Sequence, residues 1–214
     1  EPVVDACTLC DMCFMTKCPY VPPHDFDLDF PHLMLQAKAV KHKKFGISAR
    51  DKILSGTDGL GKLAGIPVIT ETVNAVSHWK PVRKAVQGVL GIHEKAWLPE
   101  FAPKKLRQII NKAKVLEVRD GERSSGKVAI FATCYINYNE PGIGTDLVKV
   151  LEHNEIPWVI AEKEVCCGMP KLEQGDLEAV ERLKRINIPH LAKLAREGYA
   201  ILAGVPSCTL MFKQ

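Results

Sequence analysis

The sequence predicts an α/β domain at the C-terminus, preceded by an all-helical segment and a mostly helical spacer. Three short apolar runs, at 128–132, 158–160 and 199–202, alternate with helical stretches, which is the pattern of a parallel sheet. Four cysteines crowd into the first eighteen residues, ahead of a long helical stretch. The expected parts are residues 1–45, 46–126 and 127–214.

The C-terminal part is predicted to be a three-layer βαβαβ unit. The run Val128–Ala132 is continuously apolar, as in a strand buried on both faces. Helices are expected at 144–154 and 176–197, the second one kinked at Pro189. In such a sheet, ligands gather at the carboxyl ends of the strands.

The N-terminal part is expected to be loop up to residue 26 and helix from Phe30. Asp29 is a good N-cap and Pro31 a good first-turn residue. The predicted apolar stripe is Leu33, Ala37 and Val40, and the opposite face is basic. This face is either simply solvated or a docking patch for an acidic partner. Its residues are Lys38, Lys41, His42, Lys43 and Lys44.

The spacer is interrupted by glycines and prolines, so its helices are expected to be short. One amphipathic helix is predicted at 103–117, with Leu106 on its apolar face, and a polar linker at 119–126. The segment Gly56–Leu63 nearly matches a phosphate-binding loop, but Leu63 replaces the required hydroxyl residue. We therefore expect a flexible turn there. The apolar face of the helix predicted at 103–117 also includes Ile109, Ile110 and Ala113.

Composition and charge are those of an ordinary globular protein. Of 214 residues, 46% are hydrophobic and 25% charged, which excludes a collagen-like, mucin-like or disordered chain. No apolar run has the length of a membrane span, and no signal peptide is recognisable. Residues 1–126 carry 19 basic against 14 acidic side chains, a net +5 that suits an acidic protein partner or a membrane surface rather than nucleic acid. The chain lacks a starting Met, so we expect a piece of a longer protein.

The first cysteine group has the spacing of an iron–sulfur motif. Cys7, Cys10, Cys13 and Cys18 follow the pattern C-x2-C-x2-C-x4-C-P, one residue longer before the last cysteine than the ferredoxin-type motif. Three cysteines at i, i+3 and i+6 can hold three irons of a [4Fe–4S] cluster. In two-cluster ferredoxins the fourth cysteine ligates the other cluster, whose remaining ligands would then precede Glu1. Zinc and a disulfide are the alternatives.

The second group is Cys134, Cys166, Cys167 and Cys208. Each follows one of the three predicted strands, so we expect the four to converge at one edge of the sheet. Adjacent thiolates need a loop that aims both inward, and Gly168 is expected to relieve the resulting backbone crowding.

The stretch Cys166-Cys167-Gly168, with a cysteine some thirty residues upstream, resembles the cysteine-rich CCG domain. That domain occurs in heterodisulfide reductase subunits and in the iron–sulfur subunit of anaerobic glycerol-3-phosphate dehydrogenase. The stretches 10–24 and 137–144 are also similar to this group. The resemblance implies an iron–sulfur subunit that transfers electrons between a flavoprotein partner and a quinone, thiol or similar acceptor. We expect a cytoplasmic protein, or one associated with the inner face of the membrane, and assign no catalytic residue.

One position departs from the family pattern. The family ends in Cys-Pro-Ser-Cys, but this chain has Val205-Pro206-Ser207-Cys208. Four cysteines suffice for a cubane cluster, and three interpretations stay open: a second iron–sulfur cluster, a zinc site, or an empty site. The alternative functions are a zinc-stabilised interaction module and a disulfide reductase acting at the CCG site. His24 and His32, near the first motif, could tune a cluster through hydrogen bonds, or pack as ordinary surface residues.

Overall fold

The computed structural model describes residues 2–16, 18–110, 126–162 and 164–213, which include all eight cysteines. These residues group into two compact units. The first consists of Glu1–Ser55, Cys167–Arg185 and Ser207–Gln214, and the second of Gly56–Cys166 and Ile186–Pro206. Within the described residues, no helix combines the length and apolarity that a membrane crossing needs.

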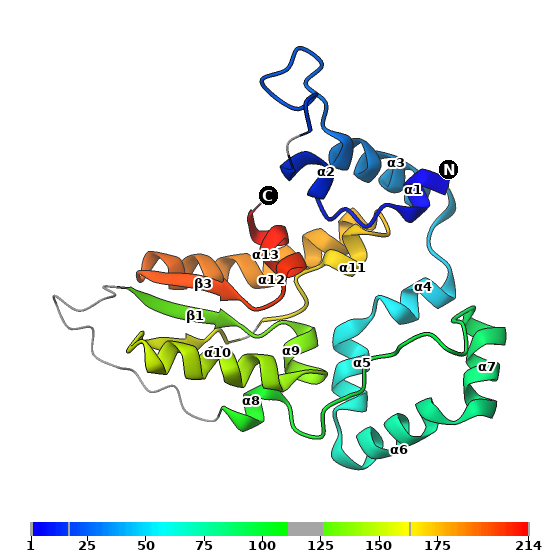
Figure 1. The fold of residues 1–214 in the computed structure, drawn as a ribbon, viewed down its shortest axis with the longest axis vertical. Helices are drawn as coiled ribbons and strands as arrows, with labels where there is room; N and C mark the ends of the chain where they lie inside the picture. Colours follow the sequence, from blue (N-terminus) through cyan, green and yellow to red (C-terminus); the bar gives the residue numbers. More distant parts are fainter. Residues whose placement is uncertain (1, 17, 111–125, 163, 214) are drawn as a thin grey trace. The chain divides into compact units, whose positions relative to one another are not determined.

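The second unit contains a three-stranded parallel sheet, as the sequence predicts. Its strands are β1 (Lys127–Phe131), β2 (Trp158–Ile160) and β3 (Tyr199–Ala203), in the order β2-β1-β3 (Figure 1). Ile130 at the centre of the sheet pairs with Ile160 of β2 and Leu202 of β3. Residues Ala129–Phe131 of β1 are almost fully buried, as expected for the central strand of a parallel sheet with helices on both faces.

The connections of the sheet are the expected helices. The first, α10 (Pro141–His153), packs Val148 and Leu151 against Ile130 and Trp158. The second, α12 (Leu177–Arg196), contains Pro189. The chain moves in opposite directions along the sheet in these two connections. Right-handed crossovers, the nearly universal form, therefore put α10 and the C-terminal part of α12 on opposite faces, which gives three layers.

The helices of the spacer also belong to the second unit. They are α5 (Thr57–Ala64), α6 (Pro67–His78), α7 (Lys80–Leu90) and α8 (Leu106–Ile109), and α9 (Cys134–Tyr138) follows β1. The flexible turn expected at Gly56–Leu63 is wrong, because this segment is mostly helix α5, whose Gly61 packs against the ring of Tyr138. Helix α8 covers only the start of the predicted helix 103–117, and 111–125, with most of the predicted linker, lies outside the described residues.

The first unit contains only helices and loops among the described residues. They are α1 (Pro2–Ala6), α2 (Met12–Met15), α3 (Phe30–Phe45), α4 (Ala49–Leu54), α11 (Met169–Leu172), the first half of α12 and most of α13 (Pro206–Lys213). Helix α3 begins as predicted, since the Asp29 carboxylate accepts the amide hydrogen of His32. The ferredoxin-type character of this part stays a prediction.

The predicted faces of α3 are wrong. Leu33 and Val40 are about half exposed, whereas Met34 and Lys38 are buried. The reason is tertiary: Gly175, which has a φ of +72°, lies directly against the backbone of Lys38. The close approach buries this side of α3, together with the aliphatic part of a lysine.

Two candidate cysteine sites

The loop of the first cysteine group has an unusual backbone conformation on both sides of Cys10. Leu9 and Asp11, on either side of it, have φ values of 52° and 62°, in the left-handed region. Leu9 is buried, which anchors the loop, while Cys10 and Cys13 are exposed and Cys7 and Cys18 half-buried. The cysteines therefore stand on a tight loop whose apolar residue, rather than its thiols, packs inward.

The thiols of this loop lie close enough to influence one another. The pKa of Cys13 is raised, first by burial and further by the nearby Cys7, Cys10 and Asp11. This proximity is what the i, i+3, i+6 spacing predicts. In the described part of the chain, however, no three Cys, His, Asp or Glu side chains are arranged to hold a metal ion. None of the eight cysteines, all of which lie in the described residues, forms a disulfide.

Helix α3 supports this loop. Both α1 and α2 pack against α3, and Lys41 Nζ lies 2.6 Å from Asp5 Oδ1 in α1. One lysine of the predicted basic face thus binds within the chain, whereas Lys43 and Lys44 are exposed.

The two histidines near the first motif have local partners. His24 Nδ1 accepts the amide hydrogen of Phe26 at 3.1 Å, in a loop where the rings of Tyr20 and Phe26 stack. The Nδ1 of His32 lies 2.8 Å from Asp29 Oδ2. Both side chains therefore stabilise the turn and the helix cap that follow Cys18.

In the second unit, Cys134 and Cys166 follow the carboxyl ends of neighbouring strands. Cys134 is the first residue of α9, where Thr133 caps the helix by accepting the amide hydrogen of Ile136. Cys166 is buried at the end of the loop after β2. In the first unit, Cys167 and Cys208 are buried as well. The convergence of all four cysteines stays a prediction.

The structure explains Gly168 differently from the sequence. Its φ is +104°, a conformation that side chains rarely adopt. An added Cβ would meet only ordinary contacts, the nearest at 3.6 Å from Leu183 and Met211. The backbone conformation, rather than crowding, is therefore what requires glycine after the paired cysteines.

Two side chains from distant segments hold the backbone at Cys166. The Oδ2 atom of Asp58, in α5, accepts the Cys166 amide hydrogen at 2.7 Å. Asn187, which is 1% exposed, accepts the amide hydrogen of Val165 at 3.0 Å and donates to the carbonyls of Val165 and Cys166. Sequence reasoning missed both residues, although Asp58 lies in the segment that resembles a phosphate loop.

An ion pair braces the same loop. Arg107 donates to the carboxylate of Glu164 and to the carbonyl of Ala161. Burial raises the pKa of Glu164 to about 7, against the lowering effect of Arg107. Burial also raises the pKa of Asp58, although its bond from Cys166 opposes this. Two carboxyl groups with raised pKa values thus lie near Cys166.

Val205, where the resemblance implies a cysteine, is half-buried and packs against the cluster of Leu106, Ala132 and Ile136. Its side chain belongs to the apolar cluster beneath α9. A cysteine at this position would therefore lie beside the helix that begins with Cys134.

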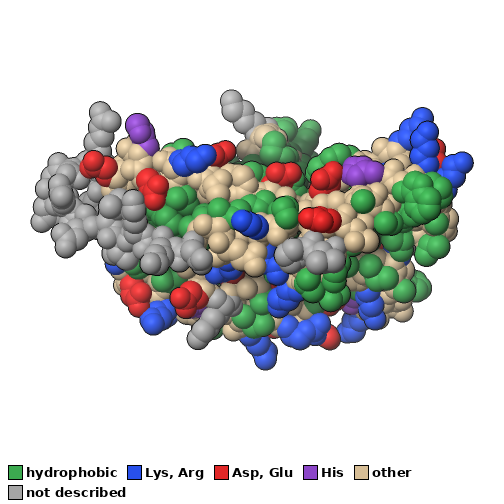
Figure 2. Space-filling model, turned by 90° about the horizontal axis from the view of Figure 1, so that it is seen from below, with side chains coloured by type: hydrophobic (Ala, Val, Ile, Leu, Met, Phe, Trp, Pro, Cys, Tyr) green, Lys and Arg blue, Asp and Glu red, His purple; other side chains and the backbone are tan. Residues whose placement is uncertain are grey.

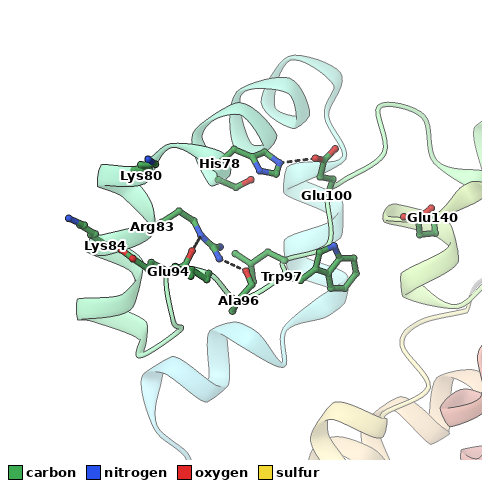
Figure 3. A pocket seen from close by; sticks show the side chains of 12 residues that line it. His78, Lys80, Arg83, Lys84, Glu94, Ala96, Trp97, Glu100 and Glu140 are labelled. Carbon is green, nitrogen blue, oxygen red and sulfur yellow. Dashed lines mark hydrogen bonds and ion pairs between the residues drawn. The ribbon is translucent and has the colours of Figure 1, made fainter.

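A separate cavity of about 730 Å³ lies between α6, α7 and the segment 94–100. Figure 3 shows that His78 pairs with Glu100 and that Arg83 donates to the backbone carbonyls of Glu94 and Ala96. The surface in Figure 2 intersperses basic and acidic side chains among hydrophobic ones. No cysteine lines this cavity, so it is distinct from both cysteine groups.

Comparison with known proteins supports a cysteine-rich domain in the C-terminal part of the chain. Residues 128–213 match the cysteine-rich domain family CCG. The chain is 26% identical over 181 residues to one subunit of the anaerobic glycerol-3-phosphate dehydrogenase of Escherichia coli K12, covering 84% of this chain and 44% of that protein. The chain thus spans less than half of this relative.

Two archaeal proteins match a shorter stretch. An uncharacterised iron–sulfur protein of Methanocaldococcus jannaschii is 32% identical over 80 residues, which cover 37% of this chain and 16% of that protein. One subunit of the CoM/CoB fumarate reductase of Methanothermobacter marburgensis is 30% identical over 79 residues, covering 37% and 15%. No solved structure matches significantly.

Proposed function

We propose that this chain is an iron–sulfur electron-transfer component of an oxidoreductase, because residues 128–213 match the cysteine-rich domain family CCG. The observation that carries the proposal is the pairing of this domain with a second group of four cysteines within twelve residues. The named relatives support it, since one is an iron–sulfur protein and two are subunits of oxidoreductases.

The N-terminal cysteines fit a [4Fe–4S] cluster by the chemistry of their donors. Cys7, Cys10 and Cys13 provide three thiols on one loop, outside any disulfide. The pKa of Cys13 is raised mainly by desolvation, and Cys7 and Cys10 lie near enough to add to the effect. A bound cluster would supply one-electron transfer. We assign these three cysteines to it and propose Cys18 as a further iron–sulfur ligand. The buried Leu9 holds the loop, and the exposure of Cys10 and Cys13 keeps the site within reach of a partner.

The CCG cysteines form the second proposed site, with Cys134, Cys166, Cys167 and Cys208 as ligands. Three of these residues are less than 10% exposed, so their thiols are shielded from water. Thiolate donors suit both iron–sulfur clusters and zinc, and metal analysis decides between the two. A redox site predicts iron with sulfide, whereas an interaction module predicts zinc.

The electron-transfer role also implies redox partners. A relay needs a donor and an acceptor, and we propose a flavoprotein on one side and a quinone, thiol or similar acceptor on the other. The exposed Lys43 and Lys44 of α3 suit an acidic protein surface or anionic lipid headgroups. We accordingly propose a cytoplasmic protein that associates peripherally with the inner face of the membrane.

Quantifying iron, zinc and acid-labile sulfide in anaerobically prepared protein tests the proposal. Iron and sulfide in equal amounts, with a paramagnetic signal on reduction, are expected. The Cys13→Ser and Cys167→Ser variants should each lose part of the iron and a different part of the signal. Zinc at both sites without sulfide, or a chain that binds neither metal, would contradict the electron-transfer role.

A further inference from the structure

Asp58 reaches Cys166 across 108 positions of sequence. Its Oδ2 atom accepts the amide hydrogen of Cys166 at 2.7 Å, and Cys166 itself is 6% exposed. A hydrogen bond from a backbone amide to a carboxylate is stronger than one between neutral groups. The bond therefore restrains the backbone from which the Cys166 thiol projects.

This contact is not the ordinary use of an aspartate in the first turn of a helix. Such a carboxylate usually stabilises the N-terminus of its own helix. The N-cap of α5 is Gly56, which provides no side-chain cap, and within the described residues Asp58 bonds to Cys166 instead. The carboxylate thus serves a segment outside its own helix.

The same helix also supports the element that carries Cys134. Gly61, one turn after Asp58, packs against the buried ring of Tyr138 in α9, and an added Cβ would lie 2.5 Å from the ring atom Cγ. Helix α9 begins with Cys134. Helix α5 therefore contacts both cysteine-bearing segments of the second unit. The carboxylate of Asp58 binds the segment of Cys166, and Gly61, which has no side chain, lets the helix approach α9 closely.

We propose that α5 is the positioning element of the CCG site, with Asp58 fixing the orientation of Cys166 and placing a negative charge beside its sulfur. The inference rests on the proposed function for the identity of the bound group. A negative charge near a thiolate ligand stabilises the more positive, oxidised state of a redox centre. The reduction potential of a group bound at Cys166 is therefore lower with Asp58 than with a neutral residue there.

Three variants test the positioning in the metal-free protein. Asp58→Ala removes the acceptor, Asp58→Asn keeps an acceptor oxygen but removes the charge, and Asp146→Ala removes an exposed carboxylate elsewhere in the same unit. Amide hydrogen exchange at Cys166, measured by mass spectrometry, should be about tenfold faster or more in Asp58→Ala, as expected for loss of a charged hydrogen bond. Asp58→Asn should change it much less, and Asp146→Ala not at all.

The charge is tested in anaerobically reconstituted protein by a redox titration followed by electron paramagnetic resonance. Asp58→Asn should raise the reduction potential of the CCG-site signal. The signal of the N-terminal cluster, identified as the one that Cys13→Ser removes, should keep its potential and serves as the internal reference. A Cys166 amide as protected in Asp58→Ala as in the parent overturns the proposal, and so does an unshifted potential in Asp58→Asn. If the parent binds no iron at this site, the proposed function fails, but hydrogen exchange still decides the role of Asp58.

Discussion

The two cysteine groups differ in how the chain holds them. The first lies on one short loop, where Cys10 and Cys13 are exposed and the neighbours in sequence provide most of the geometry. In the second group, Cys166, Cys167 and Cys208 are buried, and side chains from remote segments fix the backbone at Cys166. Local spacing defines the first group, whereas tertiary packing defines the second. Substitutions in the packed core of the second unit should therefore change the geometry of the second cysteine group and leave the first one unchanged.

The largest expected effect is the loss of the N-terminal cluster on removal of one ligand. Cys10→Ser should eliminate the paramagnetic signal of that cluster and lower the iron content, while the CCG-site signal persists. Thr8→Ala, in the same loop, serves as the control and should leave both unchanged. Iron content and spectra identical to those of the parent would refute the assignment of Cys10.

The buried carboxyl group of Glu164, close to the second cysteine group, should make the stability of the fold depend on pH. Its pKa is raised from 4.5 to about 7, so the folded chain holds a proton that the unfolded chain releases between these values. Raising the pH from 4.5 to 7 therefore favours unfolding, by up to about 3 kcal/mol from this group.

Urea unfolding of the metal-free protein at pH 5 and pH 8 measures this contribution. The parent should lose stability between the two pH values, and Glu164→Gln should lose much less of it. Glu181→Gln, on an exposed helix face, controls for removal of a carboxylate. An equal loss in the parent and in Glu164→Gln would show that Glu164 does not carry the effect.

A matched pair of glycines in α10 tests whether the packing beneath α9 governs the second group alone. An added Cβ at Gly144 would collide with Leu106 and lie 2.9 Å from Ile136, whereas Gly142 faces open space. Gly144→Ala should cost about 2 kcal/mol of stability, and Gly142→Ala should stabilise the helix by about 0.5–1 kcal/mol. Thermal unfolding checks both values. Equal changes in stability for the two substitutions would contradict the packing role of Gly144. A changed paramagnetic signal of the N-terminal cluster in Gly144→Ala would show that packing beneath α9 also affects the first cysteine group.

Val205→Cys should cost about 1 kcal/mol of stability, because a thiol replaces the methyl groups of a side chain that packs against the cluster of Leu106 and Ile136. The substitution restores the Cys-Pro-Ser-Cys ending beside Cys208. We expect tighter iron binding or a new spectroscopic signature at the CCG site. The matched control is Val205→Ala, which offers no thiol. If Val205→Cys equals the parent in iron content, spectrum and oxygen sensitivity, position 205 plays no part in metal binding.

The features that the sequence predicts correctly are those that depend on interactions between residues close together in the chain. The three strands, the helix within each crossover and the cap at Asp29 depend on residues adjacent in sequence, and all are predicted correctly. The buried face of α3 is not, because it is decided by the approach of Gly175 to Lys38. Helix α5 was mistaken for a flexible turn, since its glycines lower helix propensity and only contact with Tyr138 explains Gly61.

By itself the sequence determined the parallel strands, the two groups of four cysteines and the chemistry that thiols at these spacings favour. Hydrophobic period and ligand spacing are local properties, which a chain carries whatever its fold. Only the tertiary structure decided that Asp58 and Asn187 hold Cys166, that Arg107 pairs with Glu164, and that Val205 packs beneath α9. These contacts join residues far apart in sequence, and burial gives their charges and hydrogen bonds a strength that no pattern in the sequence reveals.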